Sequence, residues 1–425
     1  MTNETIFTMD TSSIKYGPGS TREVGIDMKG LGATRVMVVT DPRVAKLEPV
    51  EITMKALKDE GIDAVLFDQS AVEPTDASLK IAIDFAKEGN FDGYVGVGGG
   101  SSLDTAKIAN LYSTYPADLL AYVNAPIGEG RPVPGALKPM IGIPTTAGTG
   151  SETTGVAVFD LLEMKAKTGI SHRRLRPQIG IIDPNNTVTL PKMAIAACGL
   201  DVVCHAVESI TARPYNTRPA AESPIYRPSY QGANPISHVW ASRAIEMVSE
   251  NIVRSFNDPE DEEARGEMLL AASIAGVGFG NAGCHLPHGM SYPISGMVRG
   301  YIPPGYPEDH PIIPHGMSVI MSAPAVFRFT AEADPAMHLY AAGLLGAEIE
   351  GAAPEDAGEI LATAMIKIMQ QTGVPNGLSA IGYTEDDIPA FVEATLPQHR
   401  LTKLSPRPAD RDDLARLFKE SMVLW

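Results

Sequence analysis

Residues 91–107, FDGYVGVGGGSSLDTAK, place three consecutive glycines between a strand-like run and a helix expected to begin near Ser101. Glycine lets backbone N–H groups approach a phosphate closely, and a helix N-terminus adds partial positive charge. The stretch therefore predicts either a phosphate-binding loop or a tight turn in which Asp104 and Lys107 form a surface ion pair. The candidate cofactor contacts are Gly98, Gly99, Gly100, Ser101 and Asp104.

The segments before these glycines alternate between strand and helix patterns. Strand-like runs cover residues 34–42 and 63–68, and amphipathic helix-like runs cover residues 49–62 and 76–90. Asp76 is the expected N-cap of the second helix. This β-α-β-α-β order predicts a parallel sheet with helices on its faces.

The strand pattern fades after residues 177–184, and alanine- and methionine-rich segments with helical spacing follow. A chain of 425 residues also exceeds what one compact core usually holds. We therefore expect an α/β dinucleotide-binding domain over residues 1–190 and a helical domain over residues 191–425. Long proline-rich loops such as residues 213–235 usually carry function or are disordered.

Composition narrows the class of protein. The formal net charge of −17 disfavours nucleic acid and anionic membrane as partners. The sequence has no run of about eighteen apolar residues, so we expect no membrane span. The three cysteines suit a reducing compartment, and the first twenty residues resemble neither a secretory signal nor a transit peptide. We expect a cytoplasmic protein, homo-oligomeric, that acts on small molecules.

A second polar loop, PTTAGTGSE (144–152), follows another strand-like run. Two such loops at the carboxyl ends of strands favour a nucleotide crevice. Asp41 ends an earlier strand and either holds a ribose hydroxyl, which favours NAD over NADP, or caps a turn. The sequence GFGNAG (278–283) follows a helical run rather than a strand, so it predicts close helix packing instead of a nucleotide site.

Four oxygen- and nitrogen-bearing side chains form a candidate metal site. Asp201 and His205 lie four residues apart in a helical run, where they either chelate one ion or brace the helix. His288 and His315 are each followed by Gly-Met, in surroundings of small residues where a buried imidazole needs a partner. Such a set suits Fe(II), Zn(II) or Mn(II) without choosing among them.

The motifs GGGSSLDTAK, PTTAGTGSE, GLDVVCHAVES, HGMSYP and PHG, in this order, resemble the iron-containing (group III) alcohol dehydrogenase family over nearly the whole chain. The resemblance implies a dehydroquinate synthase-like architecture: a nucleotide-binding α/β domain, a helical domain and a divalent metal in the cleft between them. The implied metal ligands are Asp201, His205, His288 and His315. The implied cofactor contacts, besides the glycine loop, are Thr145, Thr146, Thr149 and Lys167.

The sequence departs from this family at one position. Many members carry a second histidine four residues after the third ligand, and here that position is Tyr292. A tyrosine can donate a hydrogen bond or pass a proton, but its ordinary pKa of about 10 makes it a poorer base. Tyr292 is the candidate catalytic residue, and we expect His285 to support the site or the core.

Within the family, the 213–235 insertion and the tail over residues 396–408 most resemble the hydroxyacid-oxoacid transhydrogenase branch. That branch implies oxidation of 4-hydroxybutyrate coupled to reduction of 2-oxoglutarate through NAD that stays bound. Both substrates are anions, so an acidic protein needs local cations. The candidates are Arg213, Arg218, Arg227 and Arg299, each of which has a structural ion pair or loop solvation as its alternative role.

The alternative is an NAD(P)-dependent alcohol dehydrogenase or aldehyde reductase that releases its cofactor. The motifs hardly distinguish this enzyme from a transhydrogenase, because the two enzyme types differ in their affinity for the nucleotide. A phosphate-handling synthase of the same architecture would need basic residues near the metal, and residues 280–316 show no such cluster. The expected cofactors are therefore NAD, or NADP, and Fe(II), or Zn(II).

Overall fold

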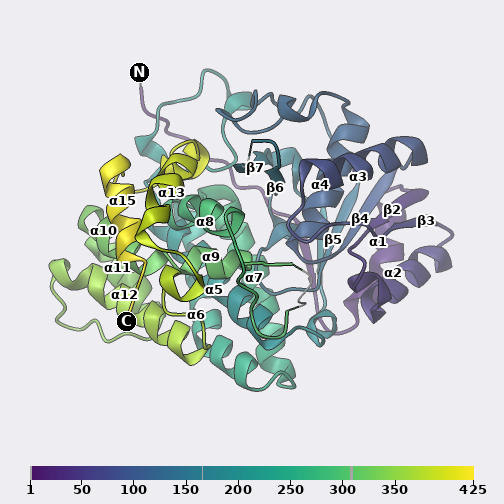
Figure 1. Ribbon diagram of the computed structural model, residues 1–425. Coiled ribbons are helices and arrows are strands. Elements are labelled where there is room, and N and C mark those ends of the chain that lie inside the picture. The colour runs from purple at the N-terminus through teal and green to yellow at the C-terminus, as the bar shows by residue number, and fades with distance from the viewer. Residues whose placement is uncertain (1, 165, 307–309) are drawn as a thin grey trace. The chain divides into compact units, whose positions relative to one another are not determined.

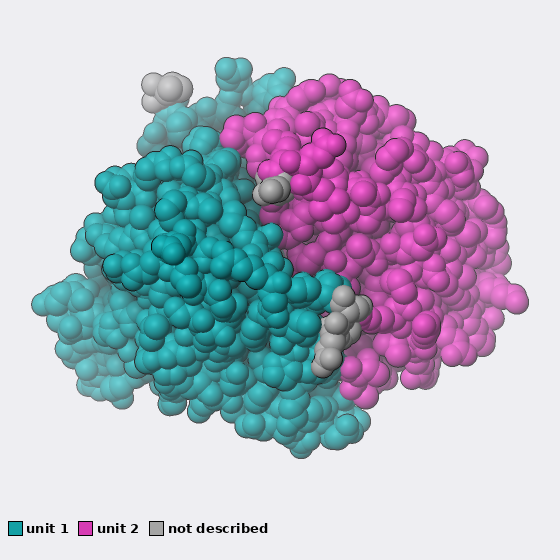
Figure 2. Space-filling view, in the orientation of Figure 1, with its two compact units in different colours: residues 1–9, 190–425 teal, residues 10–189 magenta. Residues whose placement is uncertain are grey.

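The computed structural model describes residues 2–164, 166–306 and 310–425, which form two compact units (Figure 2). The α/β unit is Asp10–Thr189, and the helical unit is Leu190–Trp425 together with Met1–Met9. The prediction assigned the first residues to the α/β domain. They lie with the helical unit because Glu4 forms ion pairs with Arg218 and Arg227 of the proline-rich insertion.

The α/β unit is built on a parallel sheet with the strand order β1-β8-β5-β4-β2-β3. Figure 1 labels its strands β2 to β5. A separate antiparallel pair, β6 and β7, lies outside this sheet. The main elements are β1 (Ser13–Tyr16), α1 (Val24–Gly30), β2 (Arg35–Val39), α2 (Glu48–Asp59), β3 (Asp63–Phe67), α3 (Asp76–Gly89), β4 (Gly93–Gly98), α4 (Gly100–Thr114), β5 (Met140–Pro144), β6 (Val156–Leu161), β7 (Ala166–Ser171) and β8 (Ile179–Ile182).

Alternate residues of the central strands enter different cores, so the sheet is covered on both faces. Val36 and Val38 of β2 belong to the core that contains residues of α1 and α2. Met37 and Val39 belong to the core that contains residues of α3 and α4. Burial on both faces explains why these strands are continuous apolar runs rather than alternating ones. The predicted α/β fold with a parallel sheet is confirmed.

One local prediction is wrong by a single residue. The N-cap of α3 is Thr75, not Asp76: the Thr75 hydroxyl accepts a hydrogen bond from the Ser78 backbone, and the Ser78 hydroxyl bonds back to the Thr75 N–H. Two reciprocal bonds satisfy two otherwise unpaired helix donors, which the Asp76 side chain one position later cannot do.

The helical unit contains no strand among its described residues, as the fading strand pattern predicts. Its helices are α5 (Lys192–Thr211), α6 (Pro235–Asn257), α7 (Glu262–Ala282), α8 (Leu286–Gly296), α9 (His315–Ile320), α10 (Ala323–Thr330), α11 (Pro335–Leu344), α12 (Ala357–Gln371), α13 (Ile388–Thr395), α14 (His399–Thr402) and α15 (Arg411–Glu420).

Helix α5 is the core of this unit and contacts α6, α7 and α9. It is long and apolar enough to cross a membrane by composition alone, but nearly all of its residues are buried inside the unit, as in the core helix of a globular domain. Gly278 and Gly280 of GFGNAG lie in α7, and Gly283 follows its end. A Cβ on Gly278 would lie 3.3 Å from the Ser237 carbonyl of α6. Close helix packing is therefore the role of Gly278, as predicted.

Candidate metal centre and nucleotide loops

Helix α5 carries three buried polar side chains on one face. Asp201, His205 and Glu208 are spaced four and three residues apart, which stacks them on successive turns. All three are buried in an otherwise apolar helix, where polar groups are costly unless each has a partner. This face is where the candidate metal site lies.

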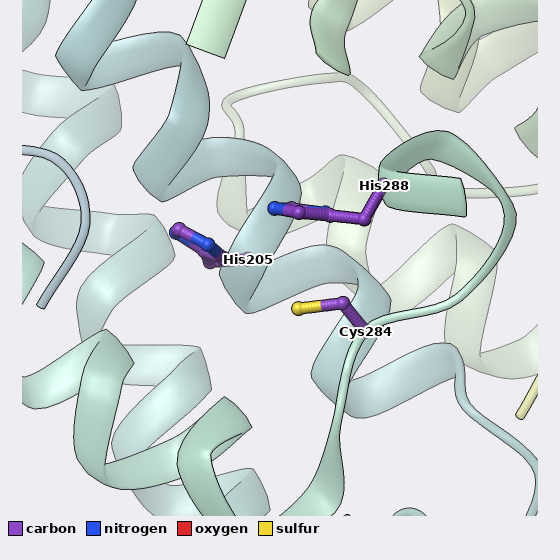
Figure 3. Close-up of side chains that lie close together, drawn as sticks. All are labelled: His205, Cys284 and His288. Carbon is purple, nitrogen blue, oxygen red and sulfur yellow. The ribbon is translucent and has the colours of Figure 1, made fainter. Parts of the chain in front are cut away.

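The structure brings Asp201, His205, His288 and His315 together. The Asp201 Oδ1 atom is 3.8 Å from His205 Nε2 and 3.5 Å from His288 Nε2. The rings of His205 and His288 stack with centroids 4.5 Å apart (Figure 3), and the His315 ring centroid is 5.5 Å from that of His288. One donor atom each from Asp201, His288 and His315 lies within 4.8 Å of the others.

Two of these donor atoms lack a partner inside the described chain. Asp201 Oδ1 and His288 Nε2 are buried and make no hydrogen bond among the described residues. Buried lone pairs normally find a partner, and a divalent cation bound by both would supply one. The residues present therefore fit a metal of the Fe(II) or Zn(II) type.

Cys284 offers a second grouping that the sequence interpretation did not include. Its Sγ lies within 4.8 Å of ligand atoms of His205 and His288 (Figure 3). Burial raises the pKa of this thiol to about 11, so it stays protonated near neutral pH, whereas metals bind the thiolate. The group with Asp201 therefore fits a metal better than the group with Cys284.

Glu208 orients His288. The Glu208 Oε1 atom accepts a hydrogen bond from His288 Nδ1 at 2.6 Å, and Oε2 accepts one from the His285 backbone N–H at 2.6 Å. Glu208 thus holds one proton on Nδ1. The neighbouring Cys284, Glu208 and Asp201 keep the pKa of His288 well above its usual value despite burial, so a metal would displace the proton on Nε2, the atom that faces Asp201. A carboxylate behind a ligating imidazole is a recurrent feature of metal sites. Sequence interpretation missed Glu208, although it lies seven residues after Asp201 on the same helix face.

The charges of the cluster suit a cation. Burial opposes ionisation of Asp201, but the neighbouring imidazoles of His205, His315 and His288 outweigh it and hold the pKa of this carboxyl below its usual range. Burial lowers the pKa of His205 to about 3, so its imidazole is neutral near neutral pH. An ionised carboxylate beside a neutral imidazole is the protonation state that binds a metal.

Of the glycines in the two His-Gly-Met sequences, Gly316 has a packing role. A Cβ on Gly316 would lie 2.0 Å from the Ala197 carbonyl oxygen and 2.6 Å from Asp201 Cβ, so only glycine lets α9 approach α5 at His315. A Cβ on Gly289 would contact Thr402 of α14 at 3.4 Å. His285, three residues before His288, is buried and hydrogen-bonds to the Thr211 hydroxyl.

In the α/β unit, the structure brings the two predicted loops together. Strands β4 and β5 are neighbours, and a Cβ on Gly99 would lie 3.3 Å from Thr146. A Cβ on Gly100 would lie 2.7 Å from Thr149, so the loop tolerates no side chain there. Helix α4 begins at Gly100 without a side-chain cap, which leaves its first N–H groups for an anion.

The neighbouring candidates support this loop. Gly98 has φ of 150°, which favours glycine, and its carbonyl accepts from the Thr145 N–H. Asp41 Oδ1 caps the following turn through the Arg43 and Val44 N–H groups, while Oδ2 lies 3.9 Å from the position of a Gly98 Cβ. The turn cap is thus present, and the second oxygen faces the glycine loop.

Asp104 and Lys107 do not form a surface pair. Lys107 is fully buried, and its Nζ lies 2.6 Å from the Ser151 hydroxyl and 3.4 Å from Asp104 Oδ1. Asp104 also accepts from the Ser151 hydroxyl and the Val158 N–H. The surface interpretation is wrong, because these groups join α4 to the second polar loop inside the unit. Ser101 accepts from the Glu73 N–H at the start of the same helix.

Lys167 lies on β7 with its ammonium group buried. Its Nζ lies 2.5 Å from Glu73 Oε2 and 3.1 Å from Asp160 Oδ1. These two carboxylates hold the pKa of Lys167 above its usual value despite burial. The side chain is therefore a fixed positive charge, and its role in cofactor binding remains a prediction.

The four arginines proposed for substrate binding all have protein partners. Arg218 and Arg227 pair with Glu4, and Arg299 pairs with Asp387. Arg213 donates to the Thr217 side chain and carbonyl. These contacts match their alternative, structural role.

A fifth arginine contacts the candidate catalytic residue. Tyr292 is buried on α8, one turn after His288, and its hydroxyl accepts a hydrogen bond of 2.7 Å from Arg400 Nη2. Sequence interpretation did not single out Arg400, although it lies in the tail segment that resembles the transhydrogenase branch. This contact spans 108 residues of sequence and depends on tertiary packing.

A nucleotide-loop α/β unit and a helical unit with a buried aspartate–histidine cluster define the class of protein. The family model "Iron-containing alcohol dehydrogenase" matches residues 11–184, and "Fe-containing alcohol dehydrogenase family, C-terminal" matches residues 228–422. The chain belongs to the iron-containing alcohol dehydrogenase family and is an oxidoreductase.

Individual relatives narrow the comparison. The chain is 52% identical to the Mus musculus protein named "Hydroxyacid-oxoacid transhydrogenase, mitochondrial", over 99% of this chain and 90% of that one. It is similar to 1,3-propanediol oxidoreductase, with a TM-score of 0.85 and 26% identity over 98% of this chain and 100% of that one. Sulfoacetaldehyde reductase from Bifidobacterium kashiwanohense in complex with NAD+ shares the fold, with a TM-score of 0.80 and 22% identity over 99% of each chain.

The expectation of a cytoplasmic protein is wrong. The Mus musculus relative is named as a mitochondrial protein, which points to that organelle. The cysteine content and acidic composition describe a reducing environment and a soluble surface, and neither distinguishes one reducing compartment from another. Organelle addresses are read from separate targeting segments rather than from the folded domain.

Proposed function

We propose that the protein is a hydroxyacid-oxoacid transhydrogenase that oxidises 4-hydroxybutyrate to succinate semialdehyde and reduces 2-oxoglutarate to 2-hydroxyglutarate. The observation that carries the proposal is the 52% identity, over nearly the full length, to a relative with that name. The buried cluster of Asp201, His205, His288 and His315 supports it from the chemical side.

These four residues would hold Fe(II), with Zn(II) as the alternative that the same donors accept. The bound ion supplies Lewis-acid polarisation of the substrate oxygen. Asp201 contributes the negative charge of the set, and Glu208 keeps the His288 lone pair available. His285 holds Glu208 through its backbone N–H.

Gly98, Gly99, Gly100 and the first turn of α4 would hold the pyrophosphate of NAD, with Thr146 and Thr149 beside it. Bound NAD supplies the hydride acceptor for the alcohol and, once reduced, the hydride donor for the oxo acid. Asp41 Oδ2 would accept from a ribose hydroxyl, a contact that a ribose phosphate would make unfavourable, so we propose NAD rather than NADP.

Tyr292 would act as a hydrogen-bond donor to substrate rather than as a base. Its oxygen already accepts from Arg400, so its own proton is directed elsewhere. The predicted homo-oligomer remains a prediction.

The test uses the Fe(II)-reconstituted protein with 4-hydroxybutyrate and 2-oxoglutarate and no added nucleotide, with 2-hydroxyglutarate followed by mass spectrometry. Many turnovers per subunit are expected, because the cofactor would be reduced and reoxidised without leaving. Activity that requires added NAD and releases NADH would instead assign the protein to the cofactor-releasing alcohol dehydrogenases. No activity in either assay would contradict the substrate assignment.

A further inference from the structure

Arg400 is a cation without an anionic partner among the described residues. None of the ion pairs between described residues includes it, although the described arginines at 213, 218, 227 and 299 all have partners. Its Nη2 donates to Tyr292, and its guanidinium carbon lies 5.0 Å from the centre of the Tyr230 ring. Its Nη1 is shielded from solvent and makes no hydrogen bond within the described residues.

A guanidinium in this state is expected to bind an anion. A charge withdrawn from water is costly unless it is paired, and a tyrosine hydroxyl and an aromatic face compensate only part of the cost. Burial alone would lower the pKa of Arg400, but the neighbouring Tyr292, Tyr230 and Cys284 keep it above its usual value, so the charge persists. The residue as a whole is only partly buried, so its side chain is not sealed inside the core.

Packing places this charge beside the proposed metal cluster. Helix α14, which carries Arg400, contacts α8, where Gly289 lies against Leu401 and Thr402. Tyr292 lies four residues after His288 on α8, so the two side chains are neighbours on one helix face. The partner of Arg400 is therefore about one helical turn away from a metal ligand.

We propose that Arg400, with the Tyr292 hydroxyl, binds the substrate's distal carboxylate, which is the carboxylate farther from the reacting carbon. The proposal rests on the proposed function and explains how one site serves both half-reactions. In 4-hydroxybutyrate and in 2-oxoglutarate, the carbon that carries the reacting oxygen is separated from this carboxylate by the same two methylene groups. A fixed arginine beside the metal cluster recognises this shared spacing, and a guanidinium receives a carboxylate bidentately.

The test compares charged and neutral substrates on the Fe(II)- and NAD-loaded enzyme. The variants are Arg400→Met, Arg400→Lys and Tyr292→Phe, with Arg243→Met as a control that removes an exposed arginine paired with Glu246. The substrates are 4-hydroxybutyrate and its neutral amide, 4-hydroxybutanamide. Binding of glutarate, which has the two carboxylates of 2-oxoglutarate but no reacting oxygen, is measured by calorimetry.

Arg400→Met is expected to lower kcat/KM for 4-hydroxybutyrate about 100-fold, mainly through KM, and to weaken glutarate by a similar factor. It should change kcat/KM for the amide by less than about threefold, because the neutral amide makes no charge–charge contact with the guanidinium that could be lost. Arg400→Lys should fall between wild type and Arg400→Met, and Tyr292→Phe should cost about tenfold. Arg243→Met should match wild type.

Equal losses for acid and amide, or unchanged glutarate affinity in Arg400→Met, would overturn the proposal. If Arg400→Met does not fold, Arg400→Lys and Tyr292→Phe decide the same question by the ratio of acid to amide. Failure of the wild type to produce 2-hydroxyglutarate without added nucleotide would contradict the proposed function alone, since glutarate binding still reports on Arg400.

Discussion

Replacing Glu208 by glutamine tests whether the cluster on α5 is built to bind a metal. The two carboxylate oxygens of Glu208 accept from two different donors, His288 Nδ1 and the His285 backbone N–H. A glutamine of the same shape has one acceptor oxygen and one NH2 group, so one of these donors must face another donor. His288 relieves the conflict by moving its proton to Nε2, the atom that faces Asp201.

The magnitude follows from this exchange of tautomers. A His288 with its proton on Nε2 has no lone pair for a metal, so binding must first restore the original tautomer against an unfavourable contact. Loss of such a supporting carboxylate typically weakens metal binding about 10- to 100-fold. This factor corresponds to about 1.4 to 2.7 kcal/mol. Because Glu208 is fully buried, we also expect the metal-free protein to lose about 1 to 3 kcal/mol of unfolding free energy.

The assay is competition between the protein and a chromogenic chelator for Co(II) or Zn(II), combined with urea denaturation of the metal-free protein. Glu4→Gln is the matched control, because it removes another buried carboxylate of the same unit, one that pairs with Arg218 and Arg227. The control should lose stability and keep its metal affinity. A folded Glu208→Gln protein with wild-type metal affinity would refute the assignment of His288 Nε2 as a ligand atom.

Three further outcomes are expected. Lys107→Met should lower the free energy of unfolding by about 3 kcal/mol in urea denaturation, because it removes a fully buried ammonium from Ser151 and Asp104. Gly316→Ala should abolish Co(II) binding, measured by visible absorption, because the added Cβ would lie 2.0 Å from a carbonyl oxygen of α5. Hydrogen bonding to Arg227 lowers the pKa of Glu4 to about 2, so its stabilising effect is complete above the ordinary value of 4.5 and is lost as the pH falls toward 2. The urea midpoint of Glu4→Gln should therefore fall less than that of wild type between pH 6 and pH 3, and an equal fall would contradict this reasoning.

How far the sequence predicts the fold depends on burial. Strands β2 and β4 were recognisable because both of their faces are covered, which makes them short apolar runs. Strand β1, SIKY, was missed because it lies at the edge of the sheet with little of it buried, so its sequence has no apolar run. The β6–β7 hairpin was missed too, since the sequence between its two strands has no turn signal of the usual two-residue type.

The site shows a similar division between local and distant information. Asp201 and His205 were predictable because one helix carries both at ligand spacing. Glu208 was open to the same argument, because it lies seven residues after Asp201, but it was not singled out. Arg400 was not predictable from spacing, because 108 residues separate it from Tyr292. Three of the four arginines that were chosen instead lie in the conspicuous 213–235 insertion, where Arg218 and Arg227 hold Glu4 near the N-terminus.

The net charge of −17 gives the proposed enzyme of anionic substrates a need for a local cation, and Arg400 is the one we propose. The overall field repels such substrates, and exposed arginines add little because solvent and neighbouring carboxylates screen them. A guanidinium that is shielded from water and kept apart from every described acid is not neutralised by its own protein. Its attraction for a substrate carboxylate therefore keeps its strength and its selectivity. The acidic surface would then oppose weak binding of anions elsewhere, while the partly buried Arg400 beside the metal cluster would favour the carboxylate of a correctly spaced substrate.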